Sequence, residues 1–203
     1  MMLASQAMTT ANKVTIARIL LVPFFVVEVL YYMKTGNEVH RVLAIIAFGI
    51  AAICDGVDGF IARRFNQRSE LGAMLDPLAD KLLLISGIIL FSFNNPHFGS
   101  IPLWLTGTVI GRDLLVLVGL GVIQITVGKV NVHPRALGKV ATVLQMLCIV
   151  WLLLKWNERL AEPWFSIWTI GAAICTGISG LFYVLDGMKQ LSSHPTSSPT
   201  PRQ

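Results

Sequence analysis

The chain has 203 residues, of which 54% are hydrophobic and only 13% are charged, and its formal net charge at pH 7 is +5. A soluble domain of this length is about one-quarter charged, so the composition excludes an ordinary soluble protein and predicts an all-α integral membrane protein. The Lys and Arg residues are not interleaved with aromatic residues on a polar face, which argues against nucleic acid. It favours anionic membrane lipids or phosphate substrates as partners.

Six apolar segments are each long enough to cross a bilayer as a helix. These transmembrane helices are predicted at residues 14–33, 40–64, 70–93, 102–127, 138–156 and 164–185. The first is too long for a cleaved signal peptide, and no A-x-A site follows it. We expect one membrane domain over residues 1–190 and a disordered tail, rich in Ser, Thr and Pro, over residues 191–203.

The first predicted span opens with three polar residues spaced three apart, Asn12, Thr15 and Arg18. This spacing places them on one stripe of the helix where it enters the membrane. Two explanations stay open. The stripe is either a helix N-terminus whose arginine reaches to the interface, or one wall of a polar site.

Four aspartates lie where the second predicted span ends and the third begins, in the stretch DGVDGFIARRFNQRSELGAMLDPLAD of residues 55–80. Charge within a membrane helix is costly and is usually functional. Asp55 and Asp58 are three apart, and Asp76 and Asp80 are four apart, so each pair lies on one face of its helix. A hairpin of the two helices would bring the four carboxylates together.

Small residues accompany the carboxylates, since Gly59 and Ala62 continue the first face and Gly72 precedes the second pair. A ligand can therefore approach the backbone closely. Four carboxylates repel one another unless cations separate them, and all-oxygen ligation suits Mg²⁺ or Mn²⁺. Two such cations promote displacement at phosphorus, and Arg63 is a candidate phosphate ligand. The alternative is that the aspartates cap helices or form ion pairs at a membrane surface.

The pattern D-x2-D-G-x2-A-R-x8-G-x3-D-x3-D is complete in residues 55–80 and resembles the signature of the CDP-alcohol phosphotransferases. The resemblance extends to N-x-x-T-x-x-R at residues 12–18 and to G-K-x-x-T-x-x-Q-M at residues 138–146. It implies transfer of a phosphatidyl group from CDP-diacylglycerol to an alcohol, with release of CMP. It also implies a homodimer.

The resemblance also implies roles for individual residues. Asp55, Asp58 and Asp76 would hold one divalent cation, and Asp55, Asp76 and Asp80 the second. Asp80 would in addition take the proton from the attacking hydroxyl. The residues expected on the nucleotide and CDP-lipid side are Gly59, Ala62, Arg63, Gly72, Asn12 and Thr15.

Three basic residues in the second half of the chain are candidates for binding the acceptor: Arg112, Arg135 and Lys139. Arg112 either binds an acceptor phosphate or pairs with a carboxylate on a neighbouring helix. Because Asp113 follows it directly, the two side chains are expected to face different directions. Lys139 either binds the acceptor or simply extends its charge to the interface.

This basic cluster favours a small dianionic acceptor, which is glycerol 3-phosphate in the similar phosphatidylglycerophosphate synthases. Residues 64–83 also resemble the corresponding stretch of eukaryotic-type cardiolipin synthases, which use phosphatidylglycerol as the acceptor. Cardiolipin synthesis therefore remains the alternative. A cation or proton transporter, from a different functional class, would use membrane carboxylates spread across the depth of the bilayer. Here the four aspartates lie at one end. A non-catalytic scaffold leaves the complete motif unexplained.

Lys and Arg residues concentrate at the aspartate end of the predicted spans. By the positive-inside rule, the active site lies at the cytoplasmic end of the second and third helices, and both termini are cytoplasmic. A bacterial inner membrane is the expected location. Cys54, Cys148 and Cys175 have no metal-ligand spacing, and we assign them no chemistry.

Overall fold

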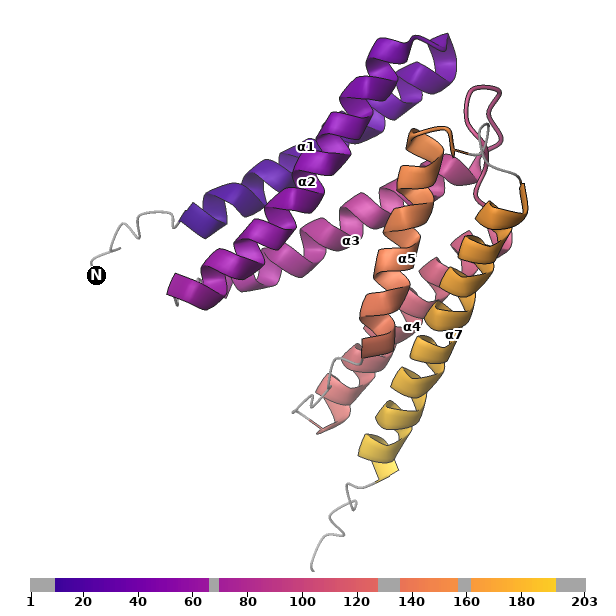
Figure 1. Cartoon of the computed structure of the whole chain (residues 1–203). Helices are drawn as coiled ribbons and strands as arrows, with labels where there is room; N and C mark the ends of the chain where they lie inside the picture. Colours follow the sequence, from indigo (N-terminus) through magenta and orange to yellow (C-terminus); the bar gives the residue numbers. More distant parts are fainter. Residues whose placement is uncertain (1–9, 66–69, 128–135, 157–161, 193–203) are drawn as a thin grey trace, which may run out of the picture. The chain divides into compact units, whose positions relative to one another are not determined.

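The computed structural model describes residues 10–65, 70–127, 136–156 and 162–192, and the described residues form helices and short connections without a strand. The helices are α1 (Thr10–Thr35), α2 (Glu38–Phe65), α3 (Glu70–Ser92), α4 (Leu103–Val127), α5 (Ala136–Leu153) and α7 (Glu162–Ser192) (Figure 1). The predicted all-α class is confirmed. Each predicted span overlaps one of these six helices.

Two helical stretches within the described residues are long and apolar enough to cross a membrane, judged by length and composition. They are Thr15–Thr35 and Pro163–Met188, with mean hydropathies of 1.9 and 1.6. Two shorter apolar stretches are Lys81–Ser92 and Leu137–Leu153. The described part of the chain is therefore all-helical with two candidate spans, and the six-span topology remains a prediction.

Two compact units make up the chain, and each is described separately. The first comprises Met1–Ile101 with Met146–Phe165, and the second comprises Pro102–Gln145 with Ser166–Gln203. The first unit therefore contains α1, α2, α3 and the C-terminal part of α5. The second contains α4, the N-terminal part of α5 and most of α7.

In the first unit, α1 packs against both α2 and α3. Six buried residues of α1 follow one another in steps of three and four: Thr15, Arg18, Val22, Phe25, Val29 and Tyr32, with Glu28 buried beside them. Such a stripe is what a helix presents to packed neighbours. The rings of Phe25 on α1 and Phe48 on α2 lie 5.5 Å apart between centroids, which fixes the register of these two helices. Polar residues thus share one stripe with core residues.

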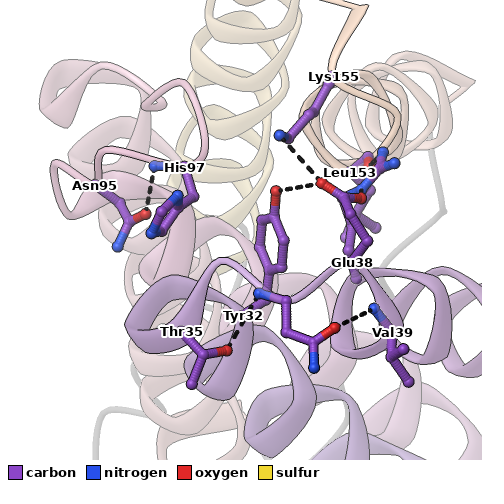
Figure 2. A network of polar contacts seen from close by, with 10 residues as sticks. Tyr32, Thr35, Glu38, Val39, Asn95, His97, Leu153 and Lys155 are labelled. Atoms are coloured by element: carbon purple, nitrogen blue, oxygen red, sulfur yellow. Dashed lines mark hydrogen bonds and ion pairs between the residues drawn. The ribbon is translucent and has the colours of Figure 1, made fainter.

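A polar network holds the turn between α1 and α2 (Figure 2). Gly36 ends α1 with a φ of 67°, a conformation that favours glycine, and its N–H donates to the carbonyl of Tyr32. A Cβ at Gly36 would lie 2.7 Å from the ring of His97, so this position requires glycine for space as well. The Tyr32 hydroxyl donates to Glu38 at 3.1 Å.

The end of α5 joins the same network. Lys155 lies 3.5 Å from the Glu38 carboxylate, and Arg41 donates to the carbonyl of Leu153 at 3.1 Å. Arg41 also donates to Glu38, and this hydrogen bond holds the pKa of the Glu38 carboxyl below its ordinary value. These contacts join α1, α2 and the end of α5 within the first unit.

Two predicted helix ends were wrong. The fifth helix was expected to reach Trp156, but α5 ends at Leu153 and Lys155 has a φ of 54°. A left-handed residue stops a helix, and the ion pair with Glu38 holds Lys155 there. The sixth was expected to end at Asp186 and Gly187, but α7 continues to Ser192. A single glycine weakens a helix by only about 1 kcal/mol, which neighbouring good helix formers offset.

Gly87 on α3 provides a test of the packing in the first unit. A Cβ there would lie 2.8 Å from Cδ1 of Ile149, a fully buried residue of α5. Gly87→Ala should therefore lower stability by about 1–3 kcal/mol, the usual cost of overpacking. Thermal unfolding in detergent measures the change.

Gly49→Ala on α2 is the matched control, because a Cβ there meets nothing within 4 Å. Alanine is the better helix former, so this change should leave stability equal or raise it by up to about 1 kcal/mol. Equal melting temperatures for the two variants would contradict the packing of α3 against α5.

Candidate functional site

The aspartate motif lies on two consecutive helices. Asp55 and Asp58 occupy the last three turns of α2, and Asp76 and Asp80 occupy the first three turns of α3. The connecting residues 66–69 lie outside the described residues. The predicted helical spacing of both pairs is therefore present in the backbone.

The description of the motif is limited to its helical backbone. The side-chain positions are not described for these residues of the motif: Asp55, Asp58, Ala62, Arg63, Asp76 and Asp80. The surroundings of Gly59 and Gly72 also lie outside the description. Among the side chains that are described, which do not include the four aspartates, no group of three or more His, Cys, Asp or Glu could hold a metal ion. Convergence of the four carboxylates therefore remains a prediction.

Helix register relates the motif to α1. Phe25 packs on Phe48, and α1 and α2 run antiparallel because only residues 36 and 37 separate them. Moving seven residues back from Phe25 reaches Arg18, and moving seven residues on from Phe48 reaches Asp55. Each step is about 10.5 Å along the axis, so these two positions lie at the same level. By the same count, Thr15 lies level with Asp58.

Arg18 and Thr15 are both buried, with 1% of each residue exposed. An arginine that extended its charge to the interface would be exposed at its tip, so the burial argues against that explanation of the first stripe. Buried arginines require compensating negative charge. Glu28, the other charged residue buried on α1, pairs with His40 at 2.7 Å and lies ten residues away. The side chain of Asn12 lies outside the described residues.

Arg112 lies in the second unit and is held by several contacts. Its Nη1 donates to Asp113 at 2.7 Å, and its Nη2 donates to Ser179 on α7 at 3.1 Å. The guanidinium carbon lies 5.4 Å from the ring centre of Tyr183. The expectation that Arg112 and Asp113 face apart was wrong for their charged groups, because the long arginine side chain bends back to its neighbour.

Lys139 is exposed in the first turns of α5, and it follows Gly138 directly. A Cβ on Gly138 would lie 3.2 Å from Nη2 of Arg112 and 3.3 Å from the Ser179 hydroxyl. The second unit therefore brings the Arg112 guanidinium against the start of the helix that carries Lys139. Arg135, the third acceptor candidate, lies outside the described residues.

The model of the CDP-alcohol phosphatidyltransferase family matches residues 8–185, which is most of the chain. The chain belongs to the CDP-alcohol phosphatidyltransferase family. The family predicted from the aspartate pattern is thus confirmed, and the match covers all six helices either wholly or in part.

Several bacterial relatives are 32–39% identical to this chain over the aligned residues. A protein of Blochmanniella floridana named CDP-diacylglycerol–glycerol-3-phosphate 3-phosphatidyltransferase is 39% identical, over 71% of this chain and 73% of its own length. A Bacillus subtilis protein with the same name is 36% identical, over 85% of this chain and 91% of its own. A Mycobacterium tuberculosis protein named probable phosphatidylglycerophosphate synthase is 32% identical, over 89% of this chain and 82% of its own length.

Sequence reasoning did not find the residues that hold Arg112. Ser179, Gly180 and Tyr183 lie on α7, far from Arg112 in the chain. Ser179 is uncharged, so its residue type alone does not mark it as a partner of an arginine. The four-residue spacing of Ser179 and Tyr183 was available as a signal, since it places a hydroxyl and an aromatic ring on one face of a helix. Only the packing of α7 against α4 shows which arginine that face meets.

Proposed function

We propose that this chain transfers the phosphatidyl group of CDP-diacylglycerol to glycerol 3-phosphate and releases CMP. The observation that carries the proposal is the complete family motif at the ends of α2 and α3, in a chain whose 36–39% identical relatives bear the name of this transferase. The acceptor hydroxyl attacks the phosphorus that bears the diacylglycerol. The bond from this phosphorus to the CMP oxygen then breaks.

Two divalent cations, Mg²⁺ or Mn²⁺, would be held by Asp55, Asp58, Asp76 and Asp80. Carboxylate oxygens suit these hard cations, and the helical spacing places each pair on one face, so the residues fit the group. When bound, such cations neutralise the diphosphate and the CMP leaving group. The buried Arg18 at the level of Asp55 supports a charged, enclosed site at this end of the first unit.

The remaining residues of the motif serve binding and proton transfer. Asp80 takes the proton from the attacking hydroxyl. Arg63 binds a phosphate oxygen, and small residues give the CDP moiety room to lie close to the helices. These small residues are Gly59, Ala62 and Gly72. Asn12 and Thr15 line the nucleotide side, and the burial of Thr15 supports this placement.

The acceptor phosphate is bound by Arg112, Lys139 and Arg135. Contact between the Arg112 guanidinium and Gly138 supports the first two, because it brings two cationic residues to one end of the second unit. The start of α5 adds backbone N–H groups and the positive end of a helix dipole, both of which favour phosphate. Glycerol 3-phosphate offers a phosphate monoester that suits this set.

We also propose the topology expected from the sequence. One domain of six spans, residues 1–190, lies in a bacterial inner membrane among lipids, as a homodimer, with the aspartates and both termini on the cytoplasmic side. The two candidate spans support a membrane location. Of the tail expected over residues 191–203, residues 191 and 192 belong to α7, and residues 193–203 lie outside the described residues.

The function is tested by CMP release from the purified chain in detergent, with CDP-diacylglycerol and Mg²⁺ or Mn²⁺. Parallel reactions contain glycerol 3-phosphate, phosphatidylglycerol, inositol phosphate or serine. Release with glycerol 3-phosphate alone is the expected result. CMP release with phosphatidylglycerol alone would replace the proposal with cardiolipin synthesis. No CMP release in any reaction would favour the alternative hypothesis of a cation or proton transporter.

Asp80→Asn should abolish turnover while CDP-diacylglycerol still binds, because the amide keeps the shape of the carboxylate but accepts no proton. A loss of general base catalysis lowers kcat by about 100- to 10,000-fold. CMP release and CDP-diacylglycerol binding are measured on the same preparation. Asp186→Asn on α7 is the control and should retain activity. Turnover by Asp80→Asn at the original rate would remove Asp80 as the base.

Lys139→Ala should raise the KM for glycerol 3-phosphate and leave the KM for CDP-diacylglycerol unchanged. Loss of one charge-assisted contact to phosphate corresponds to about a 10- to 100-fold increase. Lys34→Ala, at the exposed end of α1, is the control for removal of a surface lysine. A similar rise in both constants would show that Lys139 acts on the structure rather than on the acceptor.

A further inference from the structure

Arg112 is fixed from three directions by the second unit. Asp113 lies beside it on α4, and Ser179 and Tyr183 approach from α7. Only 15% of the Arg112 side chain and 12% of the Asp113 side chain are exposed. Because Ser179 and Tyr183 are four residues apart on α7, they present the hydroxyl and the ring on one face. The guanidinium is therefore held in one orientation before any ligand binds.

Two glycines make this orientation possible. A Cβ on Gly180 would lie 3.0 Å from Cγ of Arg112, which is tighter than an ordinary contact. A Cβ on Gly138 would come within 3.2 Å of Nη2. A side chain at either position would push the guanidinium away from Ser179 or from the start of α5. The space that Arg112 occupies is thus defined by the absence of side chains on α5 and α7.

The contacts do not use the full donor capacity of the guanidinium. An arginine has five N–H groups, and one each from Nη1 and Nη2 reach Asp113 and Ser179. The Nε atom is buried without a hydrogen-bond partner among the described residues, which costs about 1–3 kcal/mol. If Arg112 served only to hold the helices together, its Nε–H group would be expected to donate a hydrogen bond as well. The geometry favours orientation of the terminal nitrogens over maximal stability.

We propose that Ser179 and Tyr183, with the space left by Gly138 and Gly180, are positioning residues that preorganise Arg112 to recognise the phosphate of the acceptor. This inference rests on the proposed transfer to glycerol 3-phosphate. Ser179 and the ring of Tyr183 do not touch the acceptor themselves. They set the direction of a bidentate donor, and preorganisation of a donor strengthens binding because less freedom is lost when the ligand arrives.

The test compares variants of the full chain in detergent with Mg²⁺, after wild-type use of glycerol 3-phosphate has been established. Ser179→Ala and Gly180→Ala should each raise the KM for glycerol 3-phosphate by about 3- to 10-fold, the effect of losing roughly one hydrogen bond. The KM for CDP-diacylglycerol and kcat should not change. Ser179→Thr, which keeps the hydroxyl, should restore the original KM.

Gly177→Ala is the matched control, because it lies on α7 three residues from Gly180 and a Cβ there meets nothing within 4 Å. It should leave all constants unchanged. A readout without turnover is the rise in melting temperature caused by glycerol 3-phosphate alone, which should shrink in Ser179→Ala and Gly180→Ala.

Unchanged constants in both variants, or equal rises in the KM values of both substrates, would overturn the positioning role. A lower melting temperature without a selective change in the glycerol 3-phosphate KM would mean that the cluster only fastens α4 to α7. Failure of the wild-type protein to use glycerol 3-phosphate would instead overturn the proposed function itself, and the positioning role with it.

Discussion

The need to compensate charge in an apolar protein governs this structure. Only 13% of the residues are charged, and several of them are buried or nearly so. An uncompensated charge in such surroundings costs several kcal/mol, so each one must have a partner or a ligand. Glu28 has a hydrogen bond with His40, and Arg112 has an ion pair with Asp113.

The stripe along α1 links this requirement to the fold. Toward the C-terminal end of α1, the stripe is a hydrophobic core of Val22, Phe25 and Val29. Toward the N-terminal end, the same register continues into Arg18 and Thr15. A helix that packs in a regular register carries polar residues into the interior as readily as apolar ones, provided that the neighbouring helix offers complementary groups. The antiparallel register places α2 so that its own apolar face runs toward Asp55. The buried stripe of α1 therefore leads toward the level at which the helical backbone carries Asp55.

Much of this could be predicted from sequence, because helix position and the motif depend on local order. Apolar length located six helices, and the spacing of Asp55 to Asp80 identified the family that the comparisons confirm. Helix ends were harder, since α5 ends at Leu153 next to a left-handed Lys155, which contacts Glu38 over one hundred positions away. The environment of Arg112 could not be predicted either. Its partner on α4 is adjacent in sequence, but its partners on α7 are set by tertiary packing.

The surroundings of Arg112 also bear on which acceptor is preferred. Asp113 offsets the positive charge of Arg112, so in the proposed acceptor site Arg112 would direct a bound anion mainly by geometry. Lys139 then supplies charge that is not offset among its described neighbours. A phosphate monoester carries up to two negative charges near neutral pH, whereas a phosphodiester carries one. Each added cation therefore stabilises a bound monoester about twice as much as a diester by Coulomb attraction alone. In the proposed acceptor site, Arg112 and Lys139 would therefore favour the smaller and more highly charged acceptor.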